Sequence, residues 1–171
     1  MLNGKLVCLV PYTRERCHAL FRVYEADGMM TETPFLYDEQ RIDAYFAAKT
    51  SDSARHIFAI EHQGAVIGEL QLKGIDTENK TCTLSIILAN DAVKNKGFGT
   101  EAEKLAIGYA FGELRLNTVY ADTTARNTRS KHVLEKLGFR HTHDENGMCF
   151  FVLRKELFFE NGSNSISCNS F

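Results

Sequence analysis

The chain has 171 residues with a net charge of −2, and 44% of its residues are hydrophobic, which excludes a disordered chain and suits one domain with a real core. Positive and negative residues are mixed along the sequence, so a nucleic-acid binder, which usually carries a basic stripe, is not indicated. No apolar run approaches the roughly 20 residues that span a bilayer, and the first residues lack the apolar region of a signal peptide.

The first half of the chain predicts one strand, two helices and a pair of strands. Thr13 and Asp38 are residue types that favour the start of a helix, and Pro11 ends the strand before them. Gln63-Gly64 is a hairpin signal between two alternating runs. We expect a strand over 5–11, helices over 13–25 and 38–48, and strands over 56–61 and 65–72.

The second half predicts four more strands and two more helices. Gly138 stops the last helix, and Asn146-Gly147 is the turn of a final hairpin. We expect strands over 82–89, 119–123, 140–143 and 148–154, with helices from the glycines near 99 to about 117 and over 127–137.

This order of elements favours the mixed α/β class, with helices on the faces of one sheet. We expect a single domain over 1–160 and a polar, frayed tail over 161–171. The five cysteines are scattered and form no Cys-x-x-Cys pair, which indicates reduced thiols and a cytoplasmic protein.

The most informative segment is the glycine-rich run Lys94-Asn95-Lys96-Gly97-Phe98-Gly99-Thr100. A helical pattern of apolar residues begins directly after it. The start of a helix presents unpaired N–H groups and the positive end of the helix dipole, so this turn could hold a phosphate or diphosphate. Thr100 would add a hydroxyl, and Lys94 and Lys96 would add charge.

Three kinds of loop share this description. A P-loop is rejected because no lysine follows Gly99. A dinucleotide fingerprint fits 97–102, with Asp122 as the acidic ribose ligand, but the polar run 90–96 separates the glycines from the preceding strand. The third kind is the coenzyme A loop of an acyltransferase.

A second motif, Asn-Thr-Arg-Ser-Lys-His-Val-Leu-Glu-Lys-Leu-Gly-Phe over 127–139, favours the third kind of loop. Together the two segments resemble the GNAT (general control-type N-acetyltransferase) family over about 66–153, and they are most similar to its ribosomal-protein alanine acetyltransferase branch. The resemblance implies a mostly antiparallel sheet of six to seven strands. Its central strands would splay apart to admit the pantetheine arm of the coenzyme.

The resemblance implies an N-acetyltransferase that moves an acetyl group from acetyl-CoA to a primary amine by direct attack in a ternary complex. The amine could be a protein N-terminus, a polyamine or another small amine, and monomer and homodimer both stay open. We expect no nucleic acid, no membrane and no metal, since His141, His143 and Asp144 have no further spaced ligand. The alternatives are a non-catalytic acyl-CoA sensor and, from the glycines alone, a dinucleotide-dependent oxidoreductase.

The site residues follow from the resemblance. The strand that precedes the glycines would donate to the oxyanion and pair with pantetheine, and the two motifs would hold the rest of the coenzyme. The expected coenzyme-binding residues are Ile86, Ile87, Leu88, Lys94, Asn95, Lys96, Gly97, Phe98, Gly99, Thr100, Asn127 and Ser130.

Ser130 shares an inward helix face with Val133 and Leu134, and the resemblance implies that it lies by the coenzyme thiol. The alternative for Ser130 is a purely structural role, in which a serine in the first helical turn hydrogen-bonds the backbone. Asn127 could likewise serve only as the N-cap of the helix. The family's usual proton carriers, a glutamate and a tyrosine, are replaced by Leu84 and Leu134. Glu69 is therefore the candidate base, with a water chain or a solvent-facing carboxylate as alternatives. The loop 27–37 and the final hairpin are the candidate acceptor-recognition segments, with a mobile surface loop as the alternative for 27–37.

Overall fold

The computed structural model describes residues 1–29, 31 and 33–161. Its strands form one sheet of eight in the order β1-β2-β3-β4-β5-β6-β8-β7. Only β5 and β6 run parallel; the other neighbours are antiparallel. The strands are β1 (Leu2–Asn3), β2 (Cys8–Pro11), β3 (Arg55–His62), β4 (Ala65–Asp76), β5 (Thr81–Leu88), β6 (Thr118–Thr124), β7 (Arg140–Glu145) and β8 (Met148–Arg154).

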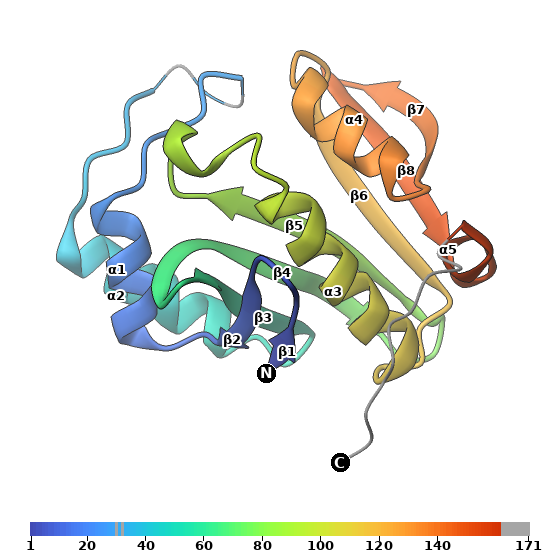
Figure 1. Cartoon of the computed structure of the whole chain (residues 1–171), viewed down its shortest axis with the longest axis horizontal. Coiled ribbons are helices and arrows are strands. Elements are labelled where there is room, and N and C mark those ends of the chain that lie inside the picture. Colours follow the sequence, from blue (N-terminus) through green and yellow to red (C-terminus); the bar gives the residue numbers. More distant parts are fainter. Residues whose placement is uncertain (30, 32, 162–171) are drawn as a thin grey trace.

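The helices cover both faces of this sheet, as expected (Figure 1). One apolar cluster joins one face to α1 and α2, and the other joins the opposite face to α3, α4 and α5. Neighbouring strand residues alternate between the clusters: Ala59 belongs to the first and Ile60 to the second. The helices are α1 (Arg14–Arg22), α2 (Glu39–Thr50), α3 (Phe98–Gly112), α4 (Thr128–Lys136) and α5 (Lys155–Asn161), with a 3₁₀ turn at Asp91–Val93.

The two central strands separate along their length, which confirms the expected splay. β5 pairs with β6 only over 81–84 against 118–121. Beyond that point β5 stays with β4 as far as Leu88, whereas β6 stays with β8 as far as Thr124. A gap therefore opens between the two strands toward α4 (Figure 1).

The three expected helix caps are confirmed. The side chains of Thr13, Asp38 and Asn127 accept hydrogen bonds from backbone N–H groups in the first turns of α1, α2 and α4. The ends of two helices were predicted wrongly. α1 stops at Arg22 rather than Glu25, and α3 stops at Gly112, before the left-handed residue Arg115 (φ 53°).

The first predicted strand, 5–11, begins only at Cys8. The backbone N–H groups of Lys5, Leu6 and Val7 donate to the carboxylate of Glu101 on α3, at 2.7 to 3.0 Å, so that segment forms a loop instead of a ladder. β1 accounts for the eighth strand, one more than the six to seven expected.

The C-terminal helix α5 was not predicted. Its Phe158 packs against Phe111 of α3, with ring centroids 5.6 Å apart. The expected frayed tail lies outside the described residues except for its first residue, Asn161, which ends α5. None of the helices that the structure describes is both long enough and apolar enough to cross a bilayer.

Candidate functional site

A cavity of about 260 Å³ lies where β5 and β6 separate. Its walls come from the edge of β5 (84–88), the start of α3, β6 (121–123) and one face of α4. Two consecutive strand–helix pairs, β5–α3 and β6–α4, therefore meet at one cavity.

The start of α3 forms one end of this cavity. The cap residue Gly97 has a φ of 83° and no side-chain capping bond, and Asn95 is also left-handed, with a φ of 60°. The first N–H groups of a helix have no acceptor within the helix, and they add to the positive end of its dipole. An anionic group in the cavity would meet these donors directly.

Ten of the twelve expected coenzyme-binding residues line the cavity, and two do not. Phe98 is buried in the core, where its ring lies 4.3 Å from that of His62 between centroids. Lys96 is exposed and is not part of the lining. The ten are Ile86, Ile87, Leu88, Lys94, Asn95, Gly97, Gly99, Thr100, Asn127 and Ser130.

Lys94 is already paired with carboxylates at the cavity wall. Its Nζ lies 2.7 Å from Asp27 Oδ2 and 2.9 Å from Asp91 Oδ1, and only 8% of its side chain is exposed. Burial lowers the pKa of Lys94, but the hydrogen bonds to the two aspartates outweigh it and leave the pKa above its usual value. Lys94 is thus a cation that already forms ion pairs with Asp27 and Asp91.

Arg129 of α4 approaches the same acids, with Nη1 3.9 Å from Asp27 and 3.7 Å from Asp91. That Nη1 atom is buried and makes no hydrogen bond to any described residue. Arg129 belongs to the second sequence motif, but the sequence alone assigned it no role. A buried guanidinium N–H without an acceptor, in the cavity wall, suits an anionic ligand.

Ser130 lies on α4 in the cavity wall beside Val133 and Leu134, so its predicted inward face is confirmed. The backbone N–H of Ser130 donates to Asn127 Oδ1 at 3.0 Å. This cap fixes the first turn of α4 through the serine's main chain, which leaves the hydroxyl available for other contacts.

Glu69 lies elsewhere. It faces α1 and α2, is 1% exposed and does not line the cavity. The hydroxyls of Tyr12 and Tyr45 donate to its two carboxylate oxygens, and Gln71 Nε2 donates at 2.6 Å. The alternative of a solvent-facing carboxylate is wrong, because the whole group is enclosed between the sheet and the two helices.

Glu103 of α3 was not predicted from the sequence as a residue of the site. It lines the cavity, is 4% exposed, and its Oε2 is buried with no hydrogen-bond partner in the described structure. Burial raises the pKa of its carboxyl to about 8. A signal existed in the sequence: Glu103 shares a helix face with Ile107 and Phe111, so a charged residue stands in an apolar stripe.

The start of the 27–37 segment, at Met29, contacts the junction of β6 and α4. The carbonyl oxygen of Met29 accepts from Thr124 Oγ1 at 2.8 Å and from Arg126 Nε at 3.0 Å, which ties the segment to the junction of β6 and α4. Phe35 packs on Tyr24, a cavity-lining residue, at 5.0 Å between centroids. Met30 and Glu32, two residues of the candidate acceptor loop, lie outside the described residues.

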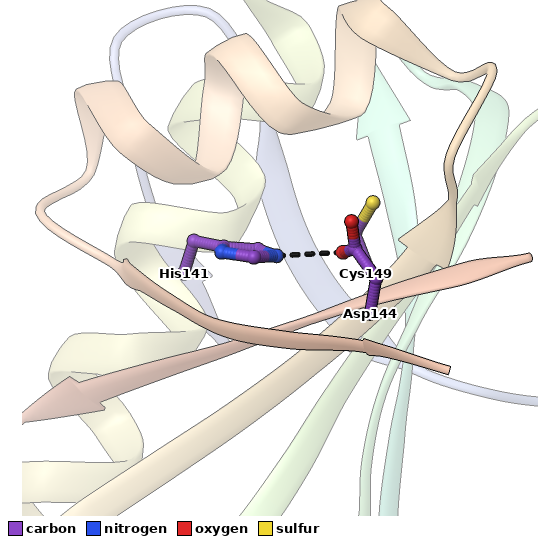
Figure 2. Close-up of side chains that lie close together, drawn as sticks. All are labelled: His141, Asp144 and Cys149. Carbon is purple, nitrogen blue, oxygen red and sulfur yellow. Dashed lines mark hydrogen bonds and ion pairs between the residues drawn. The ribbon is translucent and has the colours of Figure 1, made fainter.

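A separate cluster lies on the β7–β8 hairpin. Figure 2 shows the ring of His141 directed at Asp144, with Cys149 beside the carboxylate. His141 Nε2 lies 2.6 Å from Asp144 Oδ1, and the ligand atoms of the three residues lie within 4.8 Å of one another. Such donors can bind Zn²⁺, but the imidazole and carboxylate are exposed and bonded to each other. The absence of a metal stays a prediction.

Comparisons with known proteins point to one enzyme family. A family model described as an acetyltransferase (GNAT) domain matches residues 7–140. Spermidine N(1)-acetyltransferase of Escherichia coli K12 is 31% identical over 88 residues, which cover 52% of this chain and 47% of that protein. The putative ribosomal N-acetyltransferase YdaF of Bacillus subtilis is 32% identical over 78 residues, 46% of this chain and 42% of that protein. The chain thus matches about half the length of these curated relatives.

The fold also matches a solved structure. Spermidine N-acetyltransferase from Vibrio cholerae, in complex with CoA and spermine, superposes with a TM-score of 0.77. The match covers 91% of this chain and 99% of that one, at 19% identity. At this identity the likeness concerns the fold alone.

Proposed function

The chain belongs to the acetyltransferase (GNAT) family, and on that premise we propose that it moves an acetyl group from acetyl-CoA to a primary amine. The observation that carries the proposal is the position of the α3 start. Its unpartnered N–H groups face a cavity that continues into the gap between β5 and β6. A diphosphate at one end and a long, thin arm in the gap fit this shape.

The coenzyme would bind along the cavity in three parts. The diphosphate would accept from the N–H groups over 97–100 and from the Thr100 hydroxyl. Lys94, Asn95 and Arg129 would flank it. The pantetheine arm would then pass between Asn127 and the edge of β5, whose backbone groups over 85–88 have no β6 neighbour to pair with.

The reaction would be direct attack of the amine nitrogen on the thioester carbon. The N–C bond forms and the C–S bond breaks through a tetrahedral oxyanion, which needs fixed N–H donors. The free edge of β5 at Ile86, Ile87 and Leu88 would supply them. Ser130 would give a proton or a hydrogen bond to the leaving thiolate, which needs only modest help because an ordinary thiol has a pKa near 8.5.

The amine must lose a proton before it attacks, since an alkyl ammonium has a pKa of about 10. Glu69 is the base that the sequence suggests, but its carboxylate is enclosed by Tyr12, Tyr45 and Gln71 and does not face the cavity. These contacts favour the alternative, a water chain along the free edge of β5. Glu69 would then support the sheet and helices behind the site.

The acceptor would enter beneath the 27–37 segment, where Tyr24 and Asp27 belong to the cavity wall. An acid beside an aromatic ring suits a cationic amine with an apolar portion. The spermidine acetyltransferases among the relatives support a polyamine, and a protein N-terminus is the second candidate because a ribosomal N-acetyltransferase also matches.

Two measurements test the proposal. Thermal shift with acetyl-CoA, CoA and NAD should show stabilisation by the first two only, and stabilisation by NAD alone would favour the oxidoreductase. Formation of acetylated product from polyamines, aminoglycosides and N-terminal peptides should then identify the acceptor. Tight CoA binding without turnover of any amine would favour the acyl-CoA sensor.

The setting of the enzyme is also part of the proposal. The four cysteines within the described part of the chain are free thiols, which supports the expected cytoplasmic location. A spermidine N-acetyltransferase of Vibrio cholerae is dodecameric, so an oligomer is plausible for this chain. Light scattering after size-exclusion chromatography would distinguish a monomer, a homodimer and a larger oligomer.

A further inference from the structure

Glu103 is a buried acid that the reaction described above does not use. It lies on α3 in the cavity wall and is 4% exposed. Its Oε2 and Arg129 Nη1 are the two buried side-chain polar atoms without a partner among the described residues. Because buried polar groups in proteins are almost always hydrogen-bonded, an exception on a residue that lines a cavity points to a ligand.

We propose that Glu103 binds the coenzyme, and that its protonated carboxyl donates a hydrogen bond to an amide carbonyl of the pantetheine arm. The proposal rests on the proposed function. Glu103 follows the phosphate-binding first turn of α3 by about four residues, or roughly 6 Å along the helix axis. The pantetheine arm would leave the diphosphate near that level, and its two amides and its hydroxyl would bring polar atoms to a cavity wall that also includes Leu84, Ala121 and Leu134.

The carboxyl is in the right state for this contact. Burial alone raises its pKa to about 8, so it keeps its proton at neutral pH. The charged or titratable groups of the other cavity walls are Tyr24, Asp27, Lys94, Asp122 and Arg129. None of them is a cause of the shift. A neutral carboxyl both donates and accepts, whereas an ionised one would only accept and would repel a carbonyl oxygen.

The test compares two probes by calorimetry. Desulfo-CoA carries the pantetheine arm without a titrating thiol, and adenosine 3′,5′-bisphosphate lacks the arm altogether. At pH 7, Glu103→Leu should weaken desulfo-CoA binding by about tenfold, the usual size of one hydrogen bond, and leave the bisphosphate unchanged. Glu103→Gln, which still donates through its amide, should stay close to the wild type.

A pH series supplies the second readout. The wild-type Kd for desulfo-CoA should be flat from pH 7 to about 8 and then rise by up to about tenfold per pH unit, because only the protonated carboxyl donates. Glu103→Gln should remove this rise. Melting temperatures check that both variants fold, and if Glu103→Leu does not fold, the Glu103→Gln profile decides.

The outcomes separate the two proposals. If desulfo-CoA does not bind the wild type at all, the proposed function fails. If it binds tightly but Glu103→Leu weakens neither probe and the wild-type profile stays flat to pH 9.5, the coenzyme assignment stands and the role of Glu103 is overturned. Equal weakening of both probes would place Glu103 at the nucleotide end of the coenzyme and would also overturn the proposal.

Discussion

Lys94 and Asp27 are 67 positions apart in the sequence, yet Lys94 Nζ lies 2.7 Å from Asp27 Oδ2 at the edge of the cavity. The pair joins the glycine-rich loop, proposed to hold the coenzyme, to the 27–37 segment, proposed to receive the acceptor. The Lys94 cation therefore holds the two loops together. A substitution in one loop should alter the conformation or the ligand binding of the other.

This pair predicts opposite effects of two substitutions on CoA binding. Lys94→Met removes a cation from the diphosphate site and should weaken CoA binding by about fivefold. Asp27→Asn removes a carboxylate that repels the diphosphate and should tighten binding by about twofold at low salt, with less effect at 0.5 M salt. Calorimetry at two salt concentrations measures both. Equal weakening by both variants would mean that the pair only tethers the two loops.

We expect a substitution of Gly99 to weaken CoA binding without unfolding the protein. A Cβ at this position would touch Leu88 and Ile86 at 3.5 and 3.8 Å, and the larger valine would narrow the cavity between α3 and β5. Gly99→Val should weaken CoA binding by at least about tenfold. Gly112→Val, in the same helix with nothing within 4 Å, is the matched control and should leave binding unchanged. Unchanged affinity of Gly99→Val would contradict the coenzyme loop.

We expect a substitution of Ser130 to lower kcat rather than the affinity for CoA. Ser130→Ala keeps the backbone N–H that donates to Asn127 Oδ1, so α4 and its cap should stay intact. We expect kcat to fall by about a hundredfold, the lower range for a general acid, with the Kd for CoA nearly unchanged. Thr128→Ala, an exposed hydroxyl in the same turn, is the control. A serine that only bonds the backbone would give wild-type kcat in both variants.

We expect a substitution of Glu69 to lower the stability of the fold rather than kcat. Glu69→Gln places an amide among Tyr12, Tyr45 and Gln71 and should cost about 1–3 kcal/mol of folding free energy. We expect kcat within about fivefold of the wild type, with Tyr12→Phe behaving alike. Urea unfolding and the pH profile of kcat/KM measure the two effects. A kcat lowered a hundredfold, with the acidic limb of the profile lost, would make Glu69 the base after all.

Glu103 predicts that the folded protein loses stability as pH rises. Its pKa is about 8 in the folded protein, against about 4.3 for an ordinary glutamate. Between these values the folded state holds one more proton than the unfolded state, so the free energy of unfolding falls with pH, by at most about 1.4 kcal/mol per unit. Asp27 and Asp91 have lowered pKa values and titrate below this window.

The comparison with Glu103→Gln isolates this group. Urea unfolding at pH 5.5, 6.5, 7.5 and 8.5 should show the wild type losing stability relative to the variant up to about pH 8, and no further change above it. Parallel pH profiles for the two proteins would show that the carboxyl ionises normally.

Local signals gave the reliable part of the sequence interpretation. The caps Thr13, Asp38 and Asn127 bond groups two or three residues away, so the sequence alone places these helix starts. The hairpin turn at Gln63-Gly64 is also local, since both residues take left-handed backbone conformations. The glycine-rich turn and the second motif lie within about 45 residues, and together they indicated the family.

Contacts between distant residues decided the rest. Glu101 and Glu103 are two positions apart on one helix, but 100° of turn per residue sends them to different surroundings. Glu101 accepts the N–H groups of 5–7 and shortens a strand, whereas Glu103 enters the cavity wall. No neighbour in the sequence reveals that the first has partners and that Oε2 of the second has none among the residues that the structure describes.

The sequence by itself determined the order of elements from β2 to β8, the starts of α1, α2 and α4 and the residues of the glycine loop, because each depends on a few adjacent side chains and the backbone beside them. Only the tertiary structure decided that Lys94 is shared between two aspartates, that Glu69 is enclosed by tyrosines and that Glu103 is buried beside a cavity. Burial and pairing set the charge of an ionisable group, and both arise only when distant segments pack together.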